Sequence, residues 1–168
     1  LVIIRPCAIY GPGDLRLLKL FKLASRKVVP ILGSGKIYYH MIYIDDLIQA
    51  FLLASSSEKA LGETFIIGGD ERKTLNEIIG YISSAIDSKS VIIHLPAKPF
   101  QLMGTLCERI CVPLGIEPPI YRRRIDFFTK SRSFDNSKAR EFRGFKPTVK
   151  LREGLYVTGQ WYRESNLL

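Results

Sequence analysis

The stretch Leu1-Val-Ile-Ile-Arg-Pro-Cys-Ala-Ile-Tyr-Gly-Pro-Gly-Asp14 decides how the rest of the chain is interpreted. Its first four residues are apolar without alternation, which is typical of a strand buried on both faces of a parallel sheet. Pro6 has no N–H to donate, and Tyr10 to Gly13 predict a tight loop at the carboxyl end of that strand. Ligands of open α/β sheets bind at this end. We therefore expect an α/β fold with a ligand site close to this loop.

The composition of the chain limits which class of protein it can be. The chain has 168 residues, of which 46% are hydrophobic, so it can form one domain with a sizeable core. No apolar run is long enough for a membrane span and no stretch resembles a secretory signal, so we expect no membrane partner and a cytoplasmic location. Cys7, Cys107 and Cys111 form no Cys-x-x-Cys pattern, and we expect no metal site.

The net charge of +9 has two interpretations. An anionic partner, either nucleic acid or the phosphates of a nucleotide or nucleotide-sugar, would account for it. Alternatively, an acidic counterpart lies in another part of the same protein. No nucleic-acid-binding motif accompanies the charge, and we expect no nucleic-acid partner.

The remaining chain alternates between expected helices and strands. A hairpin-like turn is expected at residues 33–36, because a strand follows Gly-Ser-Gly-Lys where a phosphate-binding loop needs a helix. An Asp of the pair Asp45-Asp46 is expected to cap a well-buried helix, and Thr74-Leu-Asn-Glu77 forms a capping box. Expected helices cover about 15–27, 45–55, 74–86, 98–114 and 151–164, and expected strands cover about 28–32, 37–44, 62–69 and 91–95.

Several motifs, in this order, resemble the NAD-dependent epimerase/dehydratase family, the extended short-chain dehydrogenase/reductases. The first is Arg5-Pro-x-x-Ile-Tyr-Gly-Pro-Gly-Asp14, and the second is the extended segment from Tyr39 that ends in Asp45-Asp46 before a helix. A strand ending in Gly68-Gly69 and a capped helix follow. The carboxyl end carries Asp135-Asn-Ser-Lys-Ala139 and a Gly-Phe-x-Pro turn.

The resemblance implies the carboxyl-terminal part of a Rossmann-like doubly wound parallel sheet plus the smaller, mixed substrate-binding lobe. On this interpretation residues 1–168 are a single fragment whose amino-terminal NAD(P)-binding half is missing. Segments 1–14, about 37–56 and 91–95 lie on the sheet and cofactor side, and the remainder forms mostly the lobe. The opening strand would then lack parallel neighbours, so we expect exposed apolar edges and faces that promote association.

The family's catalytic Tyr-x-x-x-Lys pair and glycine-rich pyrophosphate turn do not occur in this sequence. The resemblance therefore implies part of a longer NAD- or NADP-dependent enzyme, with no catalytic residue in this chain and no activity of the fragment alone. Full-length members often form homodimers.

Family positions also imply site residues. Pro6, Ala8 and Ile9 belong to the cofactor-facing set, although Ala8 stands where sugar-nucleotide epimerases often have Asn. Tyr39 stands where those enzymes carry an Arg for the substrate diphosphate, and His40 beside it either donates to an anion when protonated or is structural. Arg124, with Arg122 and Arg123 as rivals, matches the other diphosphate-binding Arg. These arginines could instead lie along Phe127 and Phe128 or pair with Asp126.

The leading hypothesis is an epimerase, dehydratase or reductase that acts on a nucleotide-sugar by transient hydride transfer. Because Ala8 and Tyr39 replace two polar substrate contacts, a hydroxysteroid-dehydrogenase-like or dihydroflavonol-reductase-like enzyme acting on an apolar alcohol is the alternative. A non-catalytic nucleotide-binding relative is a further alternative.

Overall fold

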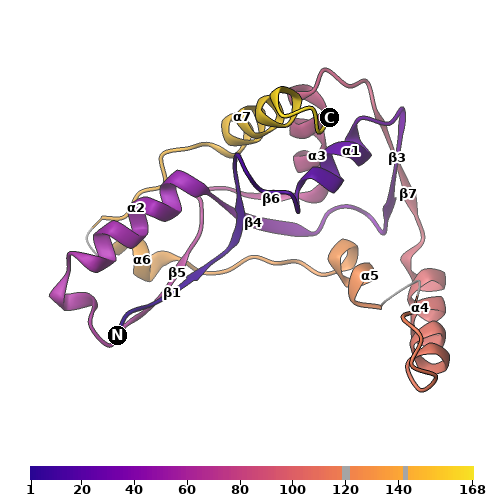
Figure 1. Cartoon of the computed structure of the whole chain (residues 1–168), viewed down its shortest axis with the longest axis horizontal. Coiled ribbons are helices and arrows are strands. Elements are labelled where there is room, and N and C mark those ends of the chain that lie inside the picture. Colours follow the sequence, from indigo (N-terminus) through magenta and orange to yellow (C-terminus); the bar gives the residue numbers. More distant parts are fainter. Residues whose placement is uncertain (119–121, 142–143) are drawn as a thin grey trace.

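The computed structural model describes residues 1–118, 122–141 and 144–168, with side chains described for all of these except 122–124 (Figure 1). The strands are β1 (Ile3–Pro6), β2 (Ala8–Tyr10), β3 (Val28–Leu32), β4 (Tyr38–Tyr43), β5 (Thr64–Ile67), β6 (Arg72–Thr74) and β7 (Val91–Leu95). The α-helices are α1 (Leu18–Ala24), α2 (Ile44–Ser55), α3 (Leu75–Ala85), α4 (Ala97–Cys111), α5 (Arg122–Thr129), α6 (Ser137–Glu141) and α7 (Leu151–Glu164). The expected α/β composition is confirmed.

The opening stretch changes partners at Cys7. Before it, β1 pairs in parallel with β5, and after it, β2 pairs in parallel with β4, which also pairs antiparallel with β6. The Cys7 N–H donates to the Ile67 carbonyl at 2.8 Å, and this hydrogen bond fixes the point where the chain passes from one sheet to the other. The predicted parallel strand is therefore present, but the stretch forms two short strands, β1 and β2, that belong to separate sheets.

The predicted hairpin at residues 33–36 is wrong. β3 pairs in parallel with β7, from Val28 beside Val91 to Leu32 beside Leu95, and it does not pair with β4. The glycine-rich turn predicts a change of direction correctly, since Gly33 and Gly35 both have positive φ. A turn pattern does not identify the partner of a strand, which here comes from a distant part of the chain.

Helices α1, α3 and α7 form the larger core with β2 and β4, and they gather on one side of β4 in Figure 1. The predicted capping box is confirmed at the start of α3: Thr74 N–H donates to Glu77 at 2.8 Å, and Glu77 N–H donates to Thr74 Oγ1 at 3.3 Å. α7 approaches the sheet closely at Gly154. Its side chains Leu155 and Tyr162 are fully buried in this core.

Helix α2 differs from the prediction in two ways. Its N-cap is Tyr43 with no side-chain cap, and Asp46 instead lies buried as the acceptor for Thr148 N–H at 2.9 Å, Thr148 Oγ1–H at 2.8 Å and Val149 N–H at 3.2 Å. Asp46 therefore connects α2 to the loop before α7, whereas Asp45 is exposed. The prediction that this helix is well buried is also wrong, because its outer side chains Ile48, Phe51 and Leu52 are at least half exposed.

The opening strand is likewise less buried than the apolar run predicted. Ile3 is 40% exposed, and within the described residues β5 is the only strand paired with β1. The two strands lie side by side below α2 in Figure 1, and α6 contacts β5. The expectation of exposed apolar faces is thus confirmed, whereas the association they would promote stays a prediction.

Helix α4 lies at the opposite end of the molecule from β1 (Figure 1). It packs on α5 and buries only Gly104, so that Leu102, Leu106 and Ile110 are exposed. Cys107 and Cys111 on this helix are half-buried. Among the helices that the structure describes, none is long and apolar enough to cross a bilayer.

Candidate functional site

A cavity of about 630 Å³ opens between α1, β4, α3 and the segment from α5 to Phe134. Its volume lies within the range of about 300 to 1,000 Å³ that small-molecule sites occupy. Its walls are mainly apolar: Leu17, Leu20 and Leu23 at α1, Met41 on β4, Leu75 and Ile78 on α3, Phe127 and Phe128 on α5, and Phe134.

Four predicted site residues line this one cavity. β2 contributes Ala8 and Ile9, and β4 contributes Tyr39 and His40. The parallel register, with Ala8 beside Met41, brings the two family motifs together. Pro6 is exposed at the end of β1 and does not line the cavity. The side chain of Arg124 lies outside the described residues.

Tyr39 lines the cavity with its side chain held by neighbouring groups. Its hydroxyl donates to the Phe127 carbonyl, and its ring lies 5.1 Å from the Phe127 ring, centroid to centroid. Burial raises the pKa of Tyr39, and the nearby Arg132 charge opposes that rise only in part. Tyr39 is therefore neutral near pH 7, and its one donor is already used.

His40 is buried and connects three segments. Its Nδ1 lies 3.1 Å from the Phe134 carbonyl and its Nε2 lies 2.8 Å from the Gly69 carbonyl. The neutral ring donates to one of these carbonyls, and only an imidazolium donates to both. Gly68 makes room for the ring, since a Cβ there would lie 2.5 Å from Cε1 and Nε2 of His40. The glycine pair after β5 thus permits this close approach.

Arg132 is a cavity residue that the sequence did not indicate. Its N–H donates to the Tyr38 carbonyl at 2.7 Å, and its carbonyl accepts from the His40 N–H at 3.0 Å, so the segment runs beside β4. Its Cζ lies 5.4 Å from the centroid of the Phe127 ring, within the range of a cation–π contact. No local pattern marks Arg132, because only the long-range bridge to Tyr39 brings it to the cavity.

Two further cations line the cavity from the segment that begins α1. Arg16 is paired with Asp14 at 2.9 Å, and Asp14 also accepts from the N–H groups of Arg16 and Leu17. Lys19 is exposed. Among the side chains that the structure describes, the cavity thus combines apolar walls with three exposed cations and one acid, Asp14, which already pairs with Arg16.

The described residues fit only part of a nicotinamide cofactor site. Pro6 and Ala8 are exposed and have small apolar side chains, and Ala8 on β2 lines the cavity, which suits contact with the flat nicotinamide ring. The chain lacks the glycine-rich turn that would hold the pyrophosphate. These residues could supply one wall of such a site and could not hold the cofactor by themselves.

Cys7 is not a candidate nucleophile. Burial raises the pKa of its thiol to about 11, although the nearby Arg72 charge acts in the opposite direction. A thiol of this pKa is almost entirely protonated at neutral pH and reacts slowly.

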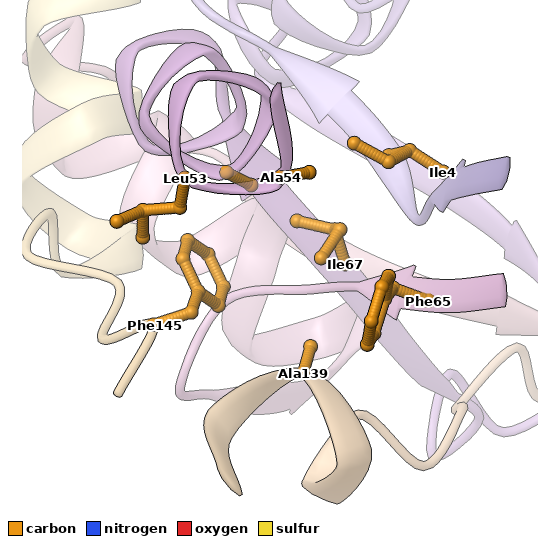
Figure 2. Close-up of a pocket in the computed structure, with 8 residues that line it drawn as sticks. Ile4, Leu53, Ala54, Phe65, Ile67, Ala139 and Phe145 are labelled. Atoms are coloured by element: carbon orange, nitrogen blue, oxygen red, sulfur yellow. The ribbon is translucent and has the colours of Figure 1, made fainter. Parts of the chain in front are cut away.

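A second, much smaller cavity of about 20 Å³ lies where α2, β1, β5 and α6 meet. Figure 2 shows its apolar lining, with Leu53 and Phe145 on one side and Phe65 and Ala139 on another. A space of this size holds about one water molecule and offers no polar partner to it. We interpret it as a packing gap in the smaller core.

No model of a known protein family matches the chain. The 3beta-hydroxysteroid-dehydrogenase/decarboxylase isoform 1 of Arabidopsis thaliana is 29% identical over 169 residues, covering 92% of this chain and 38% of that protein. The 2-alkyl-3-oxoalkanoate reductase of Stenotrophomonas maltophilia is 27% identical over 161 residues, covering 92% and 49%. The chain therefore spans less than half the length of both relatives.

Solved structures show the same fold. The UDP-glucuronic acid 4-epimerase from Bacillus cereus, solved in complex with NAD, matches with a TM-score of 0.67 at 23% identity. The match covers 98% of this chain and 45% of that chain. At this identity the likeness concerns the arrangement of helices and strands.

Proposed function

Because the chain belongs to the NAD-dependent epimerase/dehydratase family, the extended short-chain dehydrogenase/reductases, we propose that it is the carboxyl-terminal, substrate-binding half of an NAD(P)-dependent oxidoreductase. Its substrate is an apolar compound carrying a hydroxyl or oxo group. NAD or NADP, when bound, exchanges a hydride with the carbon of that group. The catalytic Tyr-x-x-x-Lys pair and the pyrophosphate turn belong to another part of the protein.

The main support for an apolar substrate is the composition of the cavity walls. Leucine, isoleucine, methionine and phenylalanine side chains supply most of its lining, so an apolar ligand gains by transfer from water. A sugar would bury several hydroxyls against these side chains, and each buried hydroxyl without a partner costs about 1 to 3 kcal/mol. The names of the hydroxysteroid and alkyl-oxoalkanoate relatives support a substrate with a large hydrocarbon part.

The state of Tyr39 supports the same substrate class. The Arg that would pair with a nucleotide-sugar diphosphate is replaced here by a neutral side chain whose hydroxyl donates to Phe127. Tyr39 instead presents an aromatic face next to Phe127. The position therefore extends the apolar wall.

A nucleotide-sugar remains the second candidate. The three cations at the cavity, Arg16, Lys19 and Arg132, favour it because they could attract a diphosphate. The fold likeness to a UDP-glucuronic acid 4-epimerase is also compatible with it.

Calorimetric titration of the 168-residue chain with decan-1-ol and with UDP-glucose separates the two candidates. We expect decan-1-ol to bind saturably at one site, and Leu20→Trp, which narrows the cavity, to weaken this binding. Leu52→Trp on exposed α2 is the matched control and should leave binding unchanged. Binding of UDP-glucose without binding of decan-1-ol would overturn the proposal in favour of the nucleotide-sugar.

A further inference from the structure

Resting on the proposed function, we propose that the ligand of the large cavity is an apolar carboxylate: the hydrocarbon part occupies the cavity, and Arg132 with Lys19 binds the carboxylate at its mouth.

Arg132 has a defined position and a free charge. Its backbone is held to β4 by hydrogen bonds with Tyr38 and His40, and its guanidinium lies against the Phe127 ring. Within residues 1–118, 122–141 and 144–168, no carboxylate lies within 4.0 Å of its side-chain nitrogens. A planar guanidinium that is positioned but unpaired is suited to bidentate contact with a carboxylate.

Lys19 is a second unpaired cation lining the same cavity. Its neighbour Arg16 is paired with Asp14 at 2.9 Å, whereas Lys19 has no acid within ion-pairing distance in the described part of the chain. Lys19 extends from α1, and Arg132 comes from the segment beside β4. Unpaired positive charge therefore lines the cavity from two separate elements.

The shape of the charge distribution favours a single carboxylate over a diphosphate. The cations that line the cavity are exposed, whereas apolar lining side chains such as Leu20, Ile78 and Phe128 are buried or partly buried. A nucleotide-sugar carries polar groups on both sides of its diphosphate, and one of these would have to enter the apolar interior without partners. A carboxylate at the end of a hydrocarbon body places its charge at the mouth and its apolar surface inside.

The test compares decanoate with decan-1-ol, two ligands with the same number of carbons that differ in charge, by calorimetry on the 168-residue chain. We expect decanoate to bind about tenfold more tightly, the effect of one charge-assisted contact at an exposed site. Arg132→Gln should remove most of this preference, and Arg132→Lys should keep a larger part of it. Lys19→Gln should reduce the preference by a smaller factor.

Arg152→Gln, on the exposed surface of α7, is the matched control and should leave both affinities unchanged. Circular dichroism of each variant checks that the fold is retained, and added salt should weaken decanoate binding alone. Equal binding of decanoate and decan-1-ol would overturn this inference and leave the proposed function standing. Absence of binding by both would overturn the proposed function itself, and tighter binding of UDP than of decanoate would overturn both.

Discussion

The large cavity and the outer face of α2 present the same kinds of side chain in opposite settings. The cavity is lined by α1, β4, α3 and α5 and carries exposed cations, whereas Ile48, Phe51 and Leu52 lie on an open helix face. An apolar surface becomes a candidate small-molecule site when it is concave and carries a few positioned polar groups. The difference shows that the enclosing elements distinguish a ligand site from an exposed face.

The largest expected effect contrasts two leucines in these settings. Leu155 is fully buried in the core beside α3, and Leu52 is 64% exposed on α2. Leu155→Ala should lower the free energy of unfolding by about 2 to 5 kcal/mol, because it leaves a cavity. Leu52→Ala should change it by less than about 0.5 kcal/mol. Urea denaturation measures both, and similar losses would contradict the assignment of the two surfaces.

Asp46 connects α2 to the loop before α7. Asp46→Asn should lower the free energy of unfolding by about 2 to 3 kcal/mol, since an amide has one acceptor oxygen for three donors from Thr148 and Val149. Asp45→Asn, one residue earlier and exposed, is the matched control. Equal urea midpoints for the two variants would show that the buried connection does not stabilise the fold.

Substitutions of two helix glycines test how closely α7 packs against Tyr10 and Tyr43. A Cβ on Gly154 would lie 2.5 Å from the Tyr10 hydroxyl, whereas a Cβ on Gly80 of α3 would meet nothing within 4 Å. Gly154→Ala should therefore lower the free energy of unfolding by about 1 to 3 kcal/mol through overpacking. Gly80→Ala should raise it by about 0.5 to 1 kcal/mol through helix propensity. Thermal unfolding should give shifts of opposite sign, and shifts of the same sign would refute the close approach.

The smallest expected effect is a difference in reactivity between the buried Cys7 thiol and the two thiols on α4. Burial raises the pKa of Cys7 to about 11, whereas Cys107 and Cys111 are half-buried on α4. At pH 8 a disulfide reagent should therefore react with the two α4 thiols well before Cys7. Because the folded-state pKa is raised, the stabilisation from neutral Cys7 is present below about pH 9 and is lost as pH rises towards 11. Rapid modification of Cys7 in the folded chain would contradict its burial.

Much of the fold could be predicted from local chemistry. The capping box of Thr74 and the amphipathic pattern of residues 151–164 identified α3 and α7, because both signals depend on neighbours within a few turns. The motif positions of Ala8, Ile9, Tyr39 and His40 indicated residues that line one cavity. Their roles towards cofactor and substrate stay predictions.

The features that could not be predicted depend on contacts between residues far apart in the sequence, which no local pattern indicates. Arg132 reaches the cavity through a bridge to Tyr39, and β3 finds its partner in β7 rather than across the adjacent turn. Helical periodicity marked the apolar residues of α2 but not whether another element covers them. The same limit applies to Asp46, whose partners lie in the loop before α7.

Methyl NMR of the 168-residue chain, titrated with decan-1-ol, tests most directly the claim that the cavity is an apolar substrate site. The methyl groups of Leu20, Leu23 and Ile78 line the cavity, and those of Ile48 and Leu52 lie on the open face of α2. We predict saturable shifts confined to the cavity methyl groups. Shifts that grow without saturation on α2, or no shifts at the cavity methyl groups, would contradict the claim.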